Sequence, residues 1–298
     1  MNNLIFLSPL LFLIMWSSGA VMVKLGLQHT NEWNFLALRA LLSFFFISIA
    51  YKLVKKPTWP SPTKAHIKDA LMTGLLLQVC YLSFYTLAIG TGMSPGLVTL
   101  ILGAQPLLVP FIQRINLPIS KKMCLVSGFS GLCIAVTGTS QINDISGWGS
   151  FFAFLALLSL TFGTIKKSNE LHPVTAMVYQ CLFSSIVFSI VSTVIGWSIE
   201  WNILLLISLV WMSLFVSIGA FLLLIYMNHN DQPDRVSLLF YAVPPVTYGF
   251  DYALFGTTLS QTTLLGILLV TISILYYRKK GSIKLQNEES LELPQSKR

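Results

Sequence analysis

Long apolar runs separated by short polar segments dominate the chain. Ten runs reach about 20 residues, the length that an α-helix needs to cross the hydrocarbon core of a bilayer. They cover approximately residues 4–27, 33–53, 68–89, 94–114, 121–140, 147–165, 173–196, 202–226, 235–256 and 259–278. Runs such as 203–226 are apolar on every face, whereas strands of a membrane barrel alternate apolar and polar residues. The pattern therefore predicts an all-α integral membrane protein with ten transmembrane helices.

Composition excludes a water-soluble surface for this chain. Hydrophobic residues make up 54% of the 298 positions and charged residues 10%, against roughly 25% charged residues in soluble domains. The first apolar run resembles a signal peptide in length, but it lacks the positively charged segment that precedes one. We therefore expect it to be retained as the first span rather than cleaved.

The basic residues are distributed unevenly between the two sides of the predicted bundle. With a cytoplasmic N-terminus, only Lys24 and Arg39 of the 19 Lys and Arg residues lie toward the outside. The positive-inside rule then predicts a multi-pass protein of the inner (plasma) membrane with both termini cytoplasmic. This explanation of the net charge of +8 removes the need for a nucleic-acid partner. Residues 279–298 are polar and are expected to form a disordered cytoplasmic tail.

The second half of the chain repeats features of the first half. A shift of 138 residues brings identical residues together, among them Pro95 with Pro233, Pro106 with Pro244 and Gly128 with Gly266. Upstream, Arg39 falls on Gln180 at a shift of 141. The comparison predicts a first repeat at 1–140 and a second at 147–278, each with five helices. An odd number of spans inverts the second repeat, which is a common construction of secondary transporters, although a duplicated scaffold is an alternative.

These features resemble the drug/metabolite transporter superfamily, specifically its EamA-type ten-helix permeases. The resemblance rests on Trp16, Ser17, Ser18 and Gly19 with Lys24, on the segment 32–39, on Pro106 and Pro244, and on the five-plus-five organisation. It implies a bacterial inner-membrane exporter or exchanger of small metabolites, amino acids or drugs. It also implies a cavity lined chiefly by helices 1, 3, 4, 6, 8 and 9. One departure is Glu32, since a proline often stands at this place, as Pro173 does in the second half.

Candidate substrate-binding residues surround two prolines near the centres of their spans. Pro106 and Pro244 each remove one backbone hydrogen bond, which leaves the carbonyls of Leu102 and Phe240 without their usual donors. Aromatic and neutral polar side chains nearby complete a site for an amphiphilic solute. The predicted substrate-binding residues are Trp16, Ser17, Tyr81, Tyr85, Gln105, Pro106, Tyr241, Pro244 and Tyr248. The alternative is that these residues serve only helix packing.

Three charged residues within the spans form a second candidate group. Asp251 is the only acidic residue set well inside a span, Arg39 lies at a comparable depth, and Lys24 lies near the outer end of helix 1. Intramembrane charges are costly and often functional, so we predict that Asp251 pairs with one of the two cations as a gating or coupling element. In the alternative, Lys24 and Arg39 snorkel to the interface and Asp251 reaches outer water.

Several chemistries have no motif in the sequence. The chain lacks the phosphate loop of ATPases and shows no cluster of metal-ligand spacing, so we expect neither catalytic residues, nor a metal, nor a cofactor. Asp231, Asp234 and Arg235 are better explained as a solvated loop than as the site of an enzyme acting on lipid-linked substrates. A non-transporting membrane subunit is the other alternative. The expected partners are the bilayer and a small zwitterionic or weakly cationic solute, with glycines that permit a homodimer.

Overall fold

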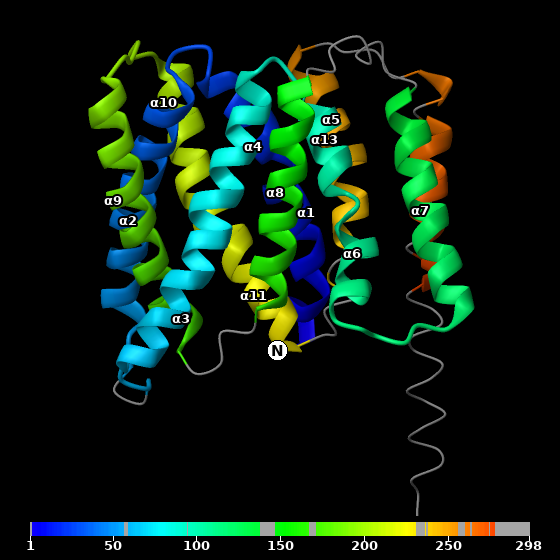
Figure 1. The fold of residues 1–298 in the computed structure, drawn as a ribbon, viewed down its shortest axis with the longest axis horizontal. Coiled ribbons are helices and arrows are strands. Elements are labelled where there is room, and N and C mark those ends of the chain that lie inside the picture. The colour runs from blue at the N-terminus through cyan, green and yellow to red at the C-terminus, as the bar shows by residue number, and fades with distance from the viewer. Residues whose placement is uncertain are drawn as a thin grey trace, which may run out of the picture.

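The computed structural model describes residues 2–56, 59–93, 95–137, 147–166, 171–230, 236, 238–255, 260–262, 264–273 and 275–277. Within these ranges every regular element is a helix, and most of the long helices run between the same two ends of the bundle (Figure 1). The all-α fold predicted from the sequence is confirmed. The segment 231–235, with Asp231, Asp234 and Arg235, and the tail 279–298 lie outside the described residues.

The helical runs coincide with the ten predicted spans. The first five runs consist of α1 (Asn2–Gly26), α2 (Glu32–Val54), the continuous series α3 (Lys64–Gly74), η1 (Leu75–Cys80) and α4 (Tyr81–Gly90), the pair α5 (Pro95–Leu102) and α6 (Gln105–Ile112), and α7 (Ile119–Thr137). The others are α8 (Gly147–Ile165), α9 (Pro173–Ile195), the series α10 (Ile203–Val210), η3 (Trp211–Ala220) and α11 (Phe221–Asn230), α13 (Leu239–Phe255), and an apolar helix within Leu264–Tyr277.

Polar residues in the loops start several of these helices. The side chain of Asn31 accepts a hydrogen bond from the backbone N–H of Asn34 at the start of α2, and Asn202 does the same for Leu204 in α10. Each cap satisfies a backbone donor that the first helical turn leaves without a partner. The short polar breaks in the apolar pattern are therefore the places where one span ends and the next begins.

The bundle presents apolar side chains outward. Six of the described runs are long and apolar enough to cross a membrane: Leu7–Gly26, Glu32–Val54, Lys64–Gly90, Gly147–Ile165, Pro173–Ile195 and Ile203–Leu224. Large hydrophobic residues such as Phe111 and Val194 are each 82% exposed. Water would not tolerate so many exposed apolar side chains, whereas lipid does. The protein is therefore a multi-pass membrane protein.

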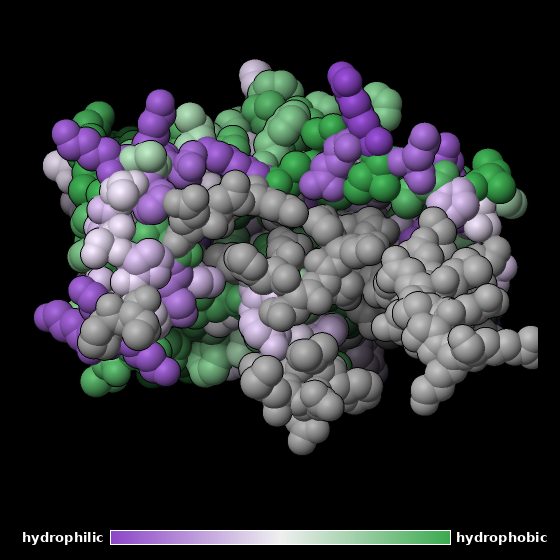
Figure 2. All heavy atoms as spheres, turned by 90° about the horizontal axis from the view of Figure 1, so that it is seen from below, coloured by the Kyte–Doolittle hydropathy of each residue, from purple (hydrophilic) through white to green (hydrophobic). Residues whose placement is uncertain are grey.

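Basic residues gather at the end of the bundle where the N-terminus lies (Figure 1). Lys52 lies in the last turn of α2, Lys64 opens α3, and Lys121 and Lys122 lie in the first turn of α7. Figure 2 views the molecule from this side and shows hydrophilic residues along the margins of the face. This distribution is the one on which the expected cytoplasmic position of the termini depends.

Two spans change from α-helical to π-helical hydrogen bonding near their centres. The π-helical segment η1 occupies Leu75–Cys80 in the third span, and η3 occupies Trp211–Ala220 in the eighth. The shift of 138 residues found in the sequence carries positions 75–80 onto 213–218, which fall inside η3. π-Helical turns are rare and often accompany functional sites, and here they occur at positions that the sequence comparison aligns.

The helices of the two halves pack mainly against each other. The closest pairings join α2 with α9, α4 with α8, and α1 with α13. Each of these pairs takes one helix from residues 1–140 and one from 147–278. The helix α7 stands at one edge of the bundle (Figure 1), where it packs in a separate hydrophobic cluster with residues of α13 and of the C-terminal helix. The main core therefore lies between the halves.

Loops from both halves also meet at both ends of the bundle. At the end away from the N-terminus, the backbone N–H of Glu200 donates to the carbonyl of His29 at 2.8 Å, and Thr30 forms an isolated β-bridge with Ile199. At the opposite end the rings of Trp59 and His172 stack with centroids 3.5 Å apart. We call the set of His29, Thr30, Ile199 and Glu200 the outer contact, and the pair Trp59 and His172 the inner contact. Contacts between the two halves therefore occur at both ends of the bundle.

Candidate functional site

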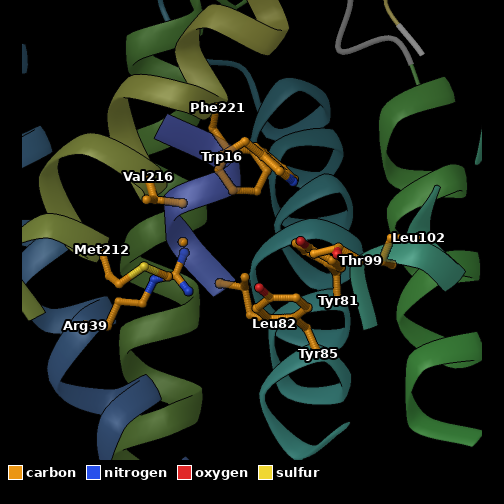
Figure 3. Close-up of a pocket in the computed structure, with 11 residues that line it drawn as sticks. Trp16, Arg39, Tyr81, Leu82, Tyr85, Thr99, Leu102, Met212, Val216 and Phe221 are labelled. Atoms are coloured by element: carbon orange, nitrogen blue, oxygen red, sulfur yellow. The ribbon is translucent and has the colours of Figure 1, made fainter. Parts of the chain in front are cut away.

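A small pocket lies between helices of both halves. Its lining comes from α1, α2, α4, α5, η3 and α11, and Figure 3 shows the side chains. The lining residues are Trp16, Gly19, Arg39, Tyr81, Leu82, Tyr85, Thr99, Leu102, Met212, Val216 and Phe221. The cavity volume is about 20 Å³, which holds water but no solute. In this structure the site is therefore too narrow for a solute.

Stacked aromatic rings form one wall of the pocket. The ring of Trp16 lies nearly parallel to that of Tyr81, with centroids 6.1 Å apart and planes at 15°. Tyr81 contacts Tyr85 at 5.7 Å, and Trp16 contacts Phe221 at 5.1 Å. Tyr81 and Tyr85 are four residues apart and therefore share one face of their helix. The wall offers flat apolar surfaces with two hydroxyl groups, which suits a ring-bearing or amphiphilic molecule.

Arg39 forms the polar side of the same pocket. Its side chain is 2% exposed and lies about 10 Å from the start of α2, at about 1.5 Å per residue. An arginine inside a bilayer helix costs about 3 kcal/mol by insertion measurements, so burial of this kind requires partners. The Nε atom donates a hydrogen bond to Ser217 Oγ at 2.8 Å, while the buried Nη1 atom has no partner within the described part of the chain. The burial excludes the alternative in which Arg39 snorkels to the interface.

Serine hydroxyls attach the backbone at Arg39 to the π-helical segment of the other half. Ser213 Oγ in η3 donates to the Arg39 carbonyl at 3.0 Å, and Ser43 Oγ donates to the same oxygen at 2.8 Å. With the bond from Nε to Ser217, these contacts fix the guanidinium relative to η3. The wider turn of a π-helix displaces side chains from the positions that an α-helix gives them. Arg39 is therefore held by the irregular part of the eighth span.

Two other predicted residues lie on α6, next to α8. Gln105 is fully buried, and its Nε2 donates to Thr164 Oγ1 at 2.9 Å, while its Oε1 has no partner among the described residues. Pro106 stands in the first turn of α6, because the span breaks after Leu102 at the turn formed by Gly103 and Ala104. The helix break predicted for the fourth span is therefore present in the structure, although neither residue lines the pocket that contains Arg39.

The candidates on α13 face different neighbours. Tyr248 packs closely against Gly96 of α5, and Thr247 Oγ1 donates to the carbonyl of Ser17 at 3.1 Å. Pro244 lies within the continuous helix α13, unlike Pro106 at its helix break. Tyr241 points to the separate cluster with α7, where its hydroxyl donates to the carbonyl of Leu125 at 2.8 Å. Trp16, Tyr81 and Tyr85 are thus the candidates that the structure brings together with Arg39.

The predicted charge pair is only partly visible. Lys24 lies in the last turn of α1 and is partly buried. Asp251 belongs to α13, but its side chain lies outside the described residues. Arg39 takes a serine hydroxyl as its observed hydrogen-bond partner. The pairing of Asp251 with Lys24 or Arg39 stays a prediction.

The resemblance implied that the eighth span lines the cavity, but the residues by which this span lines the pocket were not predicted from the sequence. Met212 and Val216 line the cavity, and Ser217 binds Arg39, yet all three belong to a run that is apolar on every face. Serines within that run are a weak signal, because a serine in a membrane helix commonly bonds to its own backbone. The switch to π-helical bonding that turns these residues inward has no sequence signature of its own.

The fold and the pocket define a multi-pass membrane protein with a central polar and aromatic site. Residues 147–278 match the profile of the EamA-like transporter family, and over these residues the match confirms the resemblance drawn from the sequence.

A solved structure, described only as "Crystal structure of protein", has the same fold, with a TM-score of 0.71 and 14% sequence identity. The alignment covers 93% of this chain and 98% of that chain, so the likeness extends over both halves. At this level of identity the likeness concerns the fold alone. A search of curated proteins gave no match.

Proposed function

We propose that the protein is a secondary transporter that moves small metabolites, amino acids or drug-like solutes across the inner membrane by alternating access. The observation that carries the proposal is the buried pocket that Trp16, Arg39, Tyr81 and Tyr85 line between helices of both halves. A site shared by two packed halves opens to one side or the other when the halves rock against each other. The match of the second half to a transporter family supports the same interpretation.

The contacts at the two ends of the bundle are suited to act as gates. The outer contact joins the loop after α1 to the loop after α9, and the inner contact joins the loop after α2 to the loop before α9. Breaking one set while keeping the other would expose the pocket to one side only. Alternating access requires this pair of states, and a ligand shifts their populations by binding one state better.

The same proposal includes an orientation and a mode of work. Both termini face the cytoplasm, because Lys52, Lys64, Lys121 and Lys122 gather at the end where the N-terminus lies. Gradients or exchange drive the protein as an exporter or exchanger. Glycines predicted to allow close helix approach are used inside the protomer, since Gly96 meets Tyr248 and Gly128 meets Tyr241. A homodimer therefore needs a different surface.

Counterflow in proteoliposomes tests the proposed function. Purified protein is reconstituted, the vesicles are loaded with unlabelled amino acids, nucleobases or cationic drugs, and uptake of the labelled solute is followed. A transporter accumulates label transiently against vesicles without protein. An enzyme acting on lipid-linked substrates or a non-transporting subunit exchanges no solute, so flat traces for every solute class would reject the proposal.

A further inference from the structure

Arg39 is a buried cation with spare hydrogen-bonding capacity. A guanidinium has five N–H donors in a planar fork and stays charged in proteins. One donor is used by Ser217, and the buried Nη1 has no partner among the residues that the structure describes. An unpaired donor on a fully buried charge is unfavourable, because neither water nor protein replaces its lost hydration. The side chain therefore suits an additional acceptor, and a negatively charged one best of all.

The unsatisfied guanidinium is part of the pocket wall. Figure 3 shows Arg39 entering the pocket from α2, while Tyr81 and Tyr85 enter it from the opposite side. The tyrosine hydroxyls are donors as well as acceptors, so both sides can donate hydrogen bonds to one acceptor group placed between them. Trp16 stacks on Tyr81 directly beside this space. The pocket thus combines a cationic end with an aromatic end.

We propose that Arg39 binds the carboxylate of the transported solute while the rings of Trp16 and Tyr81 contact its apolar part. This inference rests on the proposed function and adds a substrate class to it: small amphipathic monocarboxylates, including zwitterions. A planar guanidinium matches a carboxylate in geometry and charge. A single arginine neutralises one negative charge, whereas a phosphate dianion would require further cations in the wall, and Arg39 is the only cation among the lining residues.

The size of the closed pocket sets a condition on binding. A volume of about 20 Å³ accommodates water, so a monocarboxylate enters only after one end contact opens and the aromatic wall moves. Ser217 and Ser213 would keep the guanidinium attached to η3 during that motion. The carboxylate is then held by Arg39, the residue that links α2 to the π-helical segment η3. The bound solute would therefore lie at a contact between the two halves.

Ligand-induced thermal stabilisation provides the test, with a matched pair of probes. 3-Phenylpropionate and 3-phenylpropanamide have nearly the same shape and differ in the charge of one group. We expect the wild-type protein in detergent to bind the carboxylate at least about tenfold more tightly than the amide, the ratio expected for a hydrogen bond to a charged group. In Arg39→Gln this ratio falls to about one, and Arg39→Lys, which keeps the charge but not the fork, gives an intermediate value.

Lys64→Gln is the matched control, because it removes one positive charge from an exposed residue at the other end of the bundle. It should leave the ratio unchanged. Equal binding of the two probes by the wild type overturns the inference without any variant, so a failure of Arg39→Gln to fold does not protect it. A charge preference that persists in Arg39→Gln also overturns it. So does restoration of wild-type behaviour in the double variant Arg39→Gln with Asp251→Asn, since Asp251 would then be the partner of Arg39.

Transport is measured separately on the same variants. Carboxylate-selective binding with no exchange of any solute rejects the proposed transporter and keeps the carboxylate site. Exchange of amines and amides at the rate of carboxylates rejects the site and keeps the transporter.

Discussion

The two halves of the molecule differ at a pair of positions that the sequence comparison aligns. Arg39 in α2 and Gln180 in α9 each lie seven residues after the first residue of their helix, and each is 2% exposed. Arg39 reaches the pocket and binds Ser217, whereas Gln180 packs against Gly74 of α3. Of the two positions that the sequence comparison aligns, one thus carries a charge and the other a neutral amide.

This difference shows that the two halves are not equivalent in charge. Because α2 starts at the outer end and α9 at the inner end, the charged position lies on the outer side of the bundle centre (Figure 1). The contacts at the two ends of the bundle also differ in chemistry. The outer contact depends on neutral backbone hydrogen bonds, while the inner end has a stacked histidine and the nearby ion pair between Lys166 and Asp69, at 3.3 Å. The two ends of the bundle therefore differ in the kinds of interaction that join the halves.

Locking either end contact with a crosslink should have the largest effect, a loss of counterflow. Thr30 and Ile199 face each other in an antiparallel bridge, where the Cα spacing suits a disulfide. In a cysteine-free background, Thr30→Cys with Ile199→Cys should lose counterflow to background when oxidised and regain it on reduction. A flexible bis-thiol crosslinker between Trp59→Cys and His172→Cys should do the same at the other end. Undiminished counterflow in a fully crosslinked sample would mean that the end in question does not open.

The glycines facing the two π-helical segments should show the next largest effect. A Cβ atom at Gly163 of α8 would overlap Leu77 in η1, whereas one at Gly19 of α1 would lie 3.4 Å from Val216 in η3, an ordinary contact. Gly163→Ala should therefore lose about 1–3 kcal/mol by overpacking. Gly19→Ala should be close to neutral, because alanine is also the better helix former. Thermal unfolding in detergent separates the two, and equal losses would show that the halves pack alike here.

The ion pair at the inner end should contribute less. Asp69 is 54% and Lys166 31% exposed, so water and salt screen their attraction. Asp69→Asn and Lys166→Gln should each lower the free energy of unfolding by about 0.2–1 kcal/mol, with no further loss in the double variant. The measurement is thermal unfolding at low and high salt. Additive losses would indicate that the two side chains act independently.

The smallest expected effect is a pH dependence at His172, which precedes the membrane-spanning part of α9. Its Nδ1 accepts a hydrogen bond from the N–H of Val174, and burial lowers the pKa of its ring. Because the folded state disfavours the proton, this stabilisation is present above the unfolded pKa of about 6.5 and is lost as the pH falls through the lowered value. His172→Asn keeps an acceptor that does not titrate. Below about pH 6 the melting temperature of the wild type should therefore fall relative to that of His172→Asn. A difference that does not change with pH would contradict the assignment.

The sequence was sufficient for the helices and for part of the site. Lipid requires each span to satisfy its own backbone, so the apolar runs and their polar breaks determine the helix positions. Arg39 and the pair Tyr81 and Tyr85 were recognisable because charge is rare in a span and residues four apart share a face. Their meeting with Met212 and Ser217 was not predictable, because it depends on π-helical turns and on packing between segments more than 100 residues apart.

The tightness of the pocket also has a consequence for the membrane around it. A transporter without its solute must not become a leak, since the cell's ion gradients depend on an insulating bilayer. A cavity of about 20 Å³ holds too little water to form a continuous file across the hydrocarbon core. The fixed positive charge of Arg39 beside that water repels protons and metal cations, as arginines do in selective water channels. For the proposed transporter, the narrow pocket and its fixed charge would both oppose ion leakage by this route.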